Sequence, residues 1–420
     1  MRSNHTLSRY LGILSLVAAT LFVAACGGGD DGGSTVASNV APGAGAAPSP
    51  AETSGGMSRD VGVNSAPIIV SRGLAGIPNV PNVSVTVCVP GTSQCQTISN
   101  ILLDTGSTGL RLVGSAAFAV LGNLPTSKAG SGGILTECGQ FVSGYTWGSV
   151  RTADVTIGSL TASGMPIQVI GDQGTTNVPQ SCTGGGVSVN TVAQLGANGI
   201  LGIGPAPYDC GDICVTSKTY SRYYACPNGN ASCQITTLPL AQQVSNPVPH
   251  FPSGNDGVVI QINAPGAGTA TGVLSFGIGT PPPGKTVLTT TTNGDLRSAT
   301  FAGRTVKYAY MDTGSNGYFF GNQGLGNMPA CSDNPFYCPA TKQDMSVSLA
   351  GTSGEQATVP FSVDNADALF NGGGHAFANL AGPADASTFD LGLPFFYGRT
   401  VYIGMDRRVF GSTSLPYIAF

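Results

Sequence analysis

The chain has 420 residues, 9% of them charged, and a formal net charge of −4. This length is sufficient for two domains, or for one large two-lobed unit with an ample apolar core. Its 62 glycines and 28 prolines favour many short strands joined by turns over long helices. The negative balance provides no basic surface, so we expect no nucleic-acid partner.

The first 25 residues predict a lipoprotein signal peptide. Arg2 and Arg9 precede the apolar stretch Leu11–Ala25, as in an export signal. The stretch is short for a membrane span, although a retained anchor is the alternative. It ends in Val23-Ala24-Ala25-Cys26, which resembles the lipobox of bacterial lipoproteins. The resemblance implies cleavage before Cys26 and acylation of its thiol, so that lipid chains hold the protein at a membrane.

The expected location follows from this anchor. By resemblance to Gram-negative lipoproteins, Gly27 after Cys26 favours the outer membrane of a bacterial cell envelope, with the body facing the periplasm or the exterior. Residues 26–64 are rich in Gly, Ser, Ala and Pro, and are expected to form a disordered tether. A tether of this length reaches about 30–35 Å, so it would hold a soluble body clear of the membrane.

The folded body is expected to consist of two β lobes, residues 65–245 and 246–420. Turn residues separate the strand-like runs of the first lobe, which lie at 67–70, 83–89, 97–103, 109–113, 150–157 and 166–170. A Pro-, Asn- and Ser-rich stretch at 238–254 connects the lobes. Strands of the second lobe are predicted at 258–262, 273–276, 307–311, 317–320, 359–363, 401–403 and 417–420.

The same tetrapeptide, Asp-Thr-Gly-Ser, follows an apolar run in each lobe. Its two copies are Asp104, Thr105, Gly106 and Ser107, and then Asp312, Thr313, Gly314 and Ser315. Each aspartate supplies a carboxylate, each glycine permits close backbone approach, and the hydroxyls can hydrogen-bond backbone or carboxylate oxygens. A tight turn capped by its own side chains is the alternative for one copy alone. An apolar-Gly segment follows each copy, at 198–204 and 389–395, and a repeat of half the chain indicates two pseudo-twofold lobes.

In this order the motifs resemble those of pepsin-like aspartic peptidases. Residues 101–112 and 310–320 resemble the two catalytic turns, 145–149 the flap sequence Tyr-x-x-Gly-Ser, and 198–204 and 390–406 the segments that close each lobe. The resemblance runs from about residue 67 to the C-terminus. It implies an all-β, bilobal fold with few short helices, and an aspartic endopeptidase that hydrolyses peptides or unfolded proteins.

The resemblance also implies a role for each motif. Asp104 and Asp312 would be catalytic: two carboxylates that share one proton and activate a water held between them. The threonines would tie the turns together, and the serines would bond to the outer carboxylate oxygens. Tyr145, with Trp147 and Gly148, would form a flap over the substrate. Which aspartate acts as the base stays open.

Two residues depart from the family pattern. Arg111 stands where a tryptophan that supports the flap tyrosine is common, unless Trp147 acts from within the flap. Leu393 replaces an aspartate that often follows Leu-Gly. A non-catalytic binding or inhibitory lipoprotein on the same scaffold is therefore the alternative function, with a purely structural lipoprotein behind it. A serine hydrolase lacks its Gly-x-Ser-x-Gly motif.

Eleven cysteines are present, and setting Cys26 aside leaves ten, the even number expected in an oxidising compartment. Spacing favours the pairs Cys88–Cys95 and Cys331–Cys338, and leaves Cys138–Cys182 as a long-range pair. Connectivity stays open for the other four, Cys210, Cys214, Cys226 and Cys233, where export favours disulfides over metal. The three histidines have no ligand partners at metal spacing, so we expect no metal. We also expect no cofactor, and a monomer.

Overall fold

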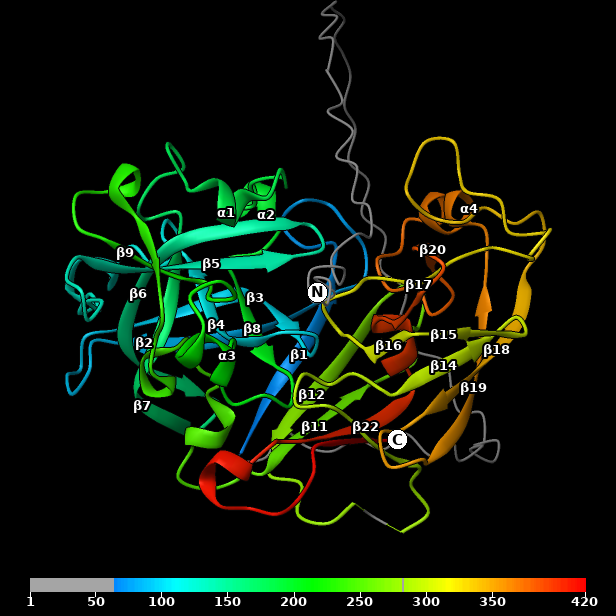
Figure 1. The fold of residues 1–420 in the computed structure, drawn as a ribbon. Helices are drawn as coiled ribbons and strands as arrows, with labels where there is room; N and C mark the ends of the chain where they lie inside the picture. The colour runs from blue at the N-terminus through cyan, green and yellow to red at the C-terminus, as the bar shows by residue number, and fades with distance from the viewer. Residues whose placement is uncertain (1–63, 282) are drawn as a thin grey trace, which may run out of the picture. The chain divides into compact units, whose positions relative to one another are not determined.

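The computed structural model describes residues 64–281 and 283–420, and their fold is all-β, as expected (Figure 1). The expected signal peptide, Cys26 and all of the tether except Asn64 lie outside the described residues. Within the described part of the chain, no helix combines the length and the apolar character that crossing a membrane requires.

A 15-stranded sheet runs through both halves of the chain. In spatial order its strands are β10 (Gln234–Thr236), β9 (Tyr223–Cys226), β5 (Ile134–Phe141), β6 (Gly144–Ile157), β7 (Leu160–Ile170), β4 (Thr108–Val113), β8 (Gly199–Ile203), β3 (Cys95–Asp104), β2 (Val80–Cys88), β1 (Ser65–Ser71), β12 (Ala270–Phe276), β11 (Gly257–Ile262), β22 (Arg399–Gly404), β23 (Tyr417–Ala419) and β13 (Val287–Thr289). Strand β6 also pairs with β2, so the first half of the sheet closes on itself around its core.

The two halves meet where β1 pairs with β12 in an antiparallel ladder from Ser65↔Ser275 to Val70↔Ala270. In Figure 1, β1, β12, β11 and β22 lie between the two halves. The described residues accordingly belong to one compact unit. The expected boundary between residues 245 and 246 stays a prediction.

Two four-stranded sheets complete the second half. One contains β15 (Arg304–Val306), β14 (Ser298–Phe301), β18 (Gln343–Ala350) and β19 (Gln356–Val363). The other contains β16 (Tyr308–Met311), β21 (Thr388–Leu391), β17 (Tyr318–Phe320) and β20 (Ala381–Pro383). The described helices are short: α1 (Gln180–Thr183), α2 (Val192–Leu195), α3 (Asp212–Thr216), α4 (Ala366–Asn371), and 3-10 turns at Leu121–Asn123, Asn230–Ser232, Leu240–Gln242, Val248–His250, Leu393–Phe396 and Arg408–Phe410.

Alternating burial explains why these segments are strands. In β2, Val83, Val85 and Val87 are buried, whereas Ser84 between them is exposed. Burying each such side chain contributes about 1.5–3 kcal/mol. The second half adds an aromatic cluster in which Phe320 stacks on Phe389, with ring centroids 5.4 Å apart.

Each half contains the same three-strand arrangement around its Asp-Thr-Gly-Ser turn. Strand β8 pairs in parallel with β3 and antiparallel with β4, and β21 pairs in the same way with β16 and β17. A glycine in the central segment permits close packing: a Cβ at Gly202 would lie 2.6 Å from the Thr108 nitrogen, and one at Gly392 would lie 2.1 Å from the Gly317 oxygen. The strand before each turn therefore pairs with one side of the central strand, and the strand after the turn pairs with its other side.

Five disulfides link the described cysteines. They join Cys88–Cys95, Cys138–Cys182, Cys210–Cys214, Cys226–Cys233 and Cys331–Cys338. The three pairs expected from spacing are confirmed. In the group of four cysteines whose connectivity was left open, each pairs with its neighbour in sequence, Cys210 with Cys214 and Cys226 with Cys233.

Candidate active site

The two Asp-Thr-Gly-Ser turns are tied to each other through their threonines. The Thr313 nitrogen donates to Thr105 Oγ1 at 2.9 Å, and the Thr105 nitrogen donates to Thr313 Oγ1 at 3.1 Å. Each hydroxyl then donates to the strand of the other half: Thr105 to the Met311 oxygen at 3.0 Å and Thr313 to the Leu103 oxygen at 2.7 Å. Both threonines are buried. This reciprocal set of four hydrogen bonds fixes one turn against the other.

The tie brings the Asp104 and Asp312 carboxyls together. The Gly106 nitrogen donates to Asp104 Oδ1 at 2.8 Å and to Asp312 Oδ1 at 3.1 Å, so one amide bridges both side chains. The Gly314 nitrogen donates to Asp312 Oδ1 at 2.7 Å. A Cβ at Gly106 would lie 2.6 Å from Asp312 Cγ, and one at Gly314 would lie 2.8 Å from Asp104 Oδ1. Glycine is required at both positions because any side chain would occupy the space of a carboxyl.

Each carboxyl also accepts a hydrogen bond from the serine of its own turn. Ser107 donates to Asp104 Oδ2, and Ser315 donates to Asp312 Oδ2 at 2.9 Å. Burial raises the pKa of Asp104 well above its usual value, and the charge of Asp312 and a hydrogen bond between the two carboxyls raise it further. The bonds from Ser107 and Gly106 oppose that rise. The pair therefore retains a proton where an isolated aspartate would have lost it.

A third carboxyl, Asp390 on β21, lies behind the second turn. It faces Tyr310 across the parallel ladder and Phe319 across the antiparallel one. Asp390 is 4% exposed, and its Oδ1 has no partner among the described residues. Burial raises its pKa well above the usual value, as does the charge of Asp312, whereas a hydrogen bond with Ser315 lowers it. Sequence reasoning did not single out Asp390, although a lone acid between Phe389 and Leu391 was a visible signal.

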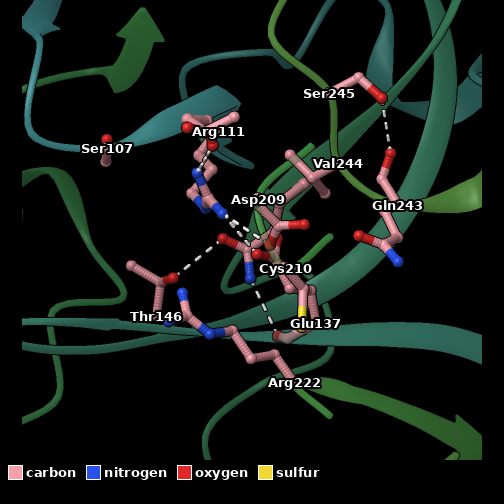
Figure 2. A network of polar contacts seen from close by, with 12 residues as sticks. Ser107, Arg111, Glu137, Thr146, Asp209, Cys210, Arg222, Gln243, Val244 and Ser245 are labelled. Carbon is pink, nitrogen blue, oxygen red and sulfur yellow. Dashed lines mark hydrogen bonds and ion pairs between the residues drawn. The ribbon is translucent and has the colours of Figure 1, made fainter. Parts of the chain in front are cut away.

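A buried cluster around Arg111 lies beside the first turn (Figure 2). Arg111 Nη2 contacts Glu137 Oε1 at 2.5 Å and Asp209 Oδ2 at 3.2 Å, and Nη1 donates to the Thr108 oxygen at 2.6 Å. The Tyr223 hydroxyl donates to Asp209 at 2.5 Å. Burial raises the pKa of Glu137 to about 8, with Arg111 opposing the rise and Asp209 adding to it. Glu137 and Asp209 thus provide acidic partners for Arg111, the residue that stands where a tryptophan was expected. The sequence did not predict these two partners.

The expected flap sequence lies on the hairpin of β5 and β6, but not at its tip. Phe141 pairs with Gly144, so the hairpin turns at residues 142–143 and Tyr145 already lies within β6. Tyr145 and Trp147 pack with the buried Cys138–Cys182 disulfide and with Tyr224. The structure places neither side chain against the aspartates, so their expected role over the substrate stays a prediction that these contacts do not support.

The opposite face of this hairpin carries the polar cluster. Glu137 lies on that face and contacts Arg111, whereas Thr146 donates to Gln168 Oε1 at 2.9 Å. Gly148, also expected in the flap, is needed for sheet packing, because a Cβ there would lie 1.8 Å from the Val169 oxygen. A strand-like segment covers the hairpin edge: the Tyr145 nitrogen donates to the Val187 oxygen at 2.9 Å.

One group of described side chains has its possible ligand atoms close enough to hold a metal ion: Cys331, Cys338 and Asp367. The two cysteines are joined in a disulfide and cannot provide thiolates. This group lies apart from the aspartate turns in sequence, and we assign it no role.

Comparison with known proteins gives a family and a distant structural likeness. Residues 60–420 match the family described as "Protein of unknown function (DUF3443)". A similar solved structure is "Crystal structure of aspartic proteinase from Irpex lacteus", with a TM-score of 0.46, 15% sequence identity, and coverage of 84% of this chain and 96% of that chain. No curated protein matches.

Proposed function

Because the chain belongs to the family described as protein of unknown function DUF3443, we propose a function from the site alone: an aspartic endopeptidase. The observation that supports it most is the meeting of Asp104 and Asp312, whose carboxyls both accept a hydrogen bond from the Gly106 amide. Two carboxyls so placed supply a base and an acid to one reacting centre.

The proposed reaction is hydrolysis of a peptide bond. The ionised carboxylate takes a proton from a water, whose oxygen forms a bond to the peptide carbonyl carbon. The protonated carboxyl gives its proton to the carbonyl oxygen and stabilises the tetrahedral intermediate. That intermediate then collapses as the C–N bond breaks: the aspartate that took the water proton gives it to the departing nitrogen, and the other aspartate takes a proton from a hydroxyl of the intermediate. The products are a carboxylic acid and an amine, and both aspartates return to their starting state.

The substrate and the location are parts of the same proposal. We propose peptides or unfolded proteins as substrates, and a monomer held at the outer membrane of a bacterial envelope through lipidated Cys26. The sequence Val23-Ala24-Ala25-Cys26 supports the anchor. The five disulfides are in keeping with an oxidising compartment outside the cytosol.

The test is cleavage of an unfolded protein by the full-length chain between about pH 3 and 7, where carboxyls with raised pKa values titrate. We expect Asp104→Asn and Asp312→Asn each to lower kcat/KM by about 10²–10⁴-fold, the usual contribution of general acid–base catalysis. A statine peptide of the pepstatin type should inhibit the wild type. The matched control is Asp344→Asn, because that side chain is 82% exposed on β18. Activity that survives both active-site substitutions would eliminate the proposal.

A non-catalytic binding or inhibitory protein is the second candidate. The hairpin favours it, because Tyr145 is buried against the Cys138–Cys182 disulfide instead of lying free above the aspartates. In that case wild type and both Asp→Asn variants would bind an unfolded protein with the same affinity and cleave it equally little. Binding and cleavage measured on the same samples separate the two functions.

A further inference from the structure

The two turns differ in how the backbone just beyond each Asp-Thr-Gly-Ser tetrapeptide is held. In the first half that residue is Thr108, and its oxygen accepts from Arg111 Nη1 at 2.6 Å, within the same half. In the second half it is Asn316, and its oxygen accepts from Asn79 Nδ2 at 2.8 Å. Asn79 belongs to the first half, where it lies between β1 and β2. The second turn is therefore held from the opposite half of the molecule.

The Asn79 side chain uses all of its hydrogen-bonding capacity on the second half. Its Nδ2 donates to the Asn316 oxygen and, at 2.9 Å, to the Phe377 oxygen. Its Oδ1 accepts from the Phe377 nitrogen at 2.7 Å and from the Tyr397 hydroxyl at 2.8 Å. A primary amide has two N–H donors and two acceptor lone pairs, so this set is complete. Asn79 is 1% exposed, and neither Asp nor Leu, which are similar in size, offers both donors.

The backbone around Asn79 is also joined to the second half. Asn79 has a φ of 60°, in the left-handed region that asparagine and glycine tolerate best. Three further hydrogen bonds cross between the halves here: the Asn79 nitrogen to the His375 oxygen at 2.8 Å, Asn316 Nδ2 to the Pro78 oxygen at 3.2 Å, and Arg72 Nη2 to the Gly374 oxygen at 2.7 Å. Residues 72–79 are thus fixed against the second half by backbone and side chain together.

These contacts reach Ser315, the last residue of the second tetrapeptide, by two routes. Asn316 is the next residue along the chain. The Leu393 nitrogen donates to the Ser315 oxygen at 2.7 Å, and Leu393 begins the 3-10 turn that Tyr397 follows. The threonine tie holds the second turn near its start, whereas Asn79 holds it just beyond its end. A turn that is fixed at both points cannot rotate about the tie.

We propose that Asn79 is a positioning residue: from the first half it fixes the backbone at Asn316, and so holds the Asp312 carboxyl where it accepts from the same Gly106 amide as Asp104. This inference rests on the proposed peptidase function and names a residue on which its geometry depends. Asn79 acts through the backbone of the turn. Because misplacing a reacting group by about 1 Å can cost about 10²-fold in rate, loss of this contact should be visible in catalysis.

The first experiment measures kcat and KM for the full-length wild type, Asn79→Gly and Asn82→Ala. Glycine accepts a φ of 60° and removes all four side-chain hydrogen bonds. In Asn79→Gly, kcat should fall by about 10–100-fold while KM changes less than about threefold, because the reacting carboxyls are displaced and the substrate contacts are not.

Asn82 provides the matched control, since it is another buried asparagine of the same segment. It is 6% exposed, and its Nδ2 donates to Ser71 Oγ at 2.7 Å and to the Val80 oxygen at 2.9 Å, both within the first half. Its loss should lower stability but leave kcat within about twofold of wild type. All variants are compared at a temperature where urea denaturation shows them to be folded.

Two kinetic results would overturn the proposal. One is an unchanged kcat in Asn79→Gly. The other is a loss of kcat that follows the loss of stability alike in both variants, because Asn79 would then be a structural residue only. If Asn79→Gly does not fold, Asn79→Asp takes its place: it keeps the acceptor oxygen but has at most one proton for two carbonyls, so kcat should fall by about fivefold. An unchanged kcat there would count equally against the proposal.

A second experiment needs no catalysis. Carboxyl carbons of ¹³C-labelled aspartates report protonation in the full-length protein by NMR. The charge of Asp312 is one cause of the raised pKa of Asp104, after burial. In Asn79→Gly that pKa should fall by about half a pH unit, as about 1 Å of added separation between the carboxyls predicts, and it should not move in Asn82→Ala.

The two experiments together separate this inference from the peptidase proposal. If the wild type does not cleave but the pKa of Asp104 falls in Asn79→Gly, the peptidase proposal fails and the positioning role stands. If the wild type cleaves and neither kcat nor that pKa changes in Asn79→Gly, the positioning role fails alone. A pKa of Asp104 that does not move in Asn79→Gly contradicts the positioning role whether or not the protein cleaves.

Discussion

The two halves of this protein hold the same tetrapeptide turn by different physical means. Next to the first turn, Arg111 is enclosed with Glu137 and Asp209 at 2% exposure or less. In the second half the nearby core is aromatic, with Phe320 stacked on Phe389. Ion pairing in a dry interior depends on every partner being present, whereas aromatic packing depends on shape. The first half should therefore be sensitive to the loss of a charged partner, and the second to a change in the volume of its core side chains.

This difference has a consequence for acidity at the site. The Arg111 cluster sets one cation against two buried acids, Asp209 and Glu137, and burial raises the pKa of Glu137 to about 8. In the second half, burial raises the pKa of Asp390, and the charge of Asp312 raises it further. Two turns that match in backbone geometry thus place their carboxyls in different electrostatic surroundings.

The largest effect should come from Arg111→Met in the charged half. Without the guanidinium, Glu137 and Asp209 lose their cation in a buried site, and the free energy of unfolding should fall by about 3–5 kcal/mol. Urea denaturation at pH 7 measures it. Arg304→Met on β15 is the matched control, since that arginine is exposed and should cost less than about 0.5 kcal/mol. A loss as small as the control's would mean that the first half does not depend on its charges.

A smaller effect, equal in the two halves, is expected from the threonines. Thr105→Val and Thr313→Val each leave one backbone N–H and one carbonyl without a partner across the turn. Each should lower the free energy of unfolding by about 1–3 kcal/mol, the cost of unsatisfied buried groups. Thr300→Val, on an exposed position of β14, is the control. Losses that differ by more than about 1 kcal/mol would show that the tie is not symmetric, since matched bonds should cost alike.

Much of this arrangement was accessible from the sequence. Apolar runs ending in Asp-Thr-Gly-Ser marked β3 and β16, and the apolar-Gly segments marked β8 and β21, because close packing at Gly202 and Gly392 allows only glycine. Short cysteine spacings marked local disulfides. These features have local causes, so they appear as local patterns.

The rest depended on tertiary contacts. Strand β5 was missed because Ile134–Phe141 contains Glu137, whose partner Arg111 lies 26 residues earlier in the chain. The position of Tyr145 also could not be predicted, since its side-chain direction follows from the register Gln140↔Tyr145 and from the disulfide beneath it. Asp390 was visible as an acid in an apolar strand, but its proximity to Asp312 requires the parallel pairing of β16 and β21.

The smallest effect at any single step of pH should be a change in the slope of stability against pH, and it belongs to the first half. Glu137 has a pKa of about 8 in the folded state, against 4.5 as the ordinary value, so the folded protein holds a proton that the unfolded chain releases. Glu137 therefore contributes stability that is complete below about pH 4.5 and is lost as pH rises to about 8, at up to about 1.4 kcal/mol per pH unit. Glu137→Gln should remove that share of the slope, whereas Asp104 and Asp390 retain theirs. Glu355→Gln is the matched control, because its pKa lies below the ordinary value and outside this window. The measurement is the free energy of unfolding at half-unit steps from pH 5 to 8. If Glu137 is ionised in the folded protein, the plots for Glu137→Gln and wild type will be parallel, and the pH dependence of stability does not come from Glu137.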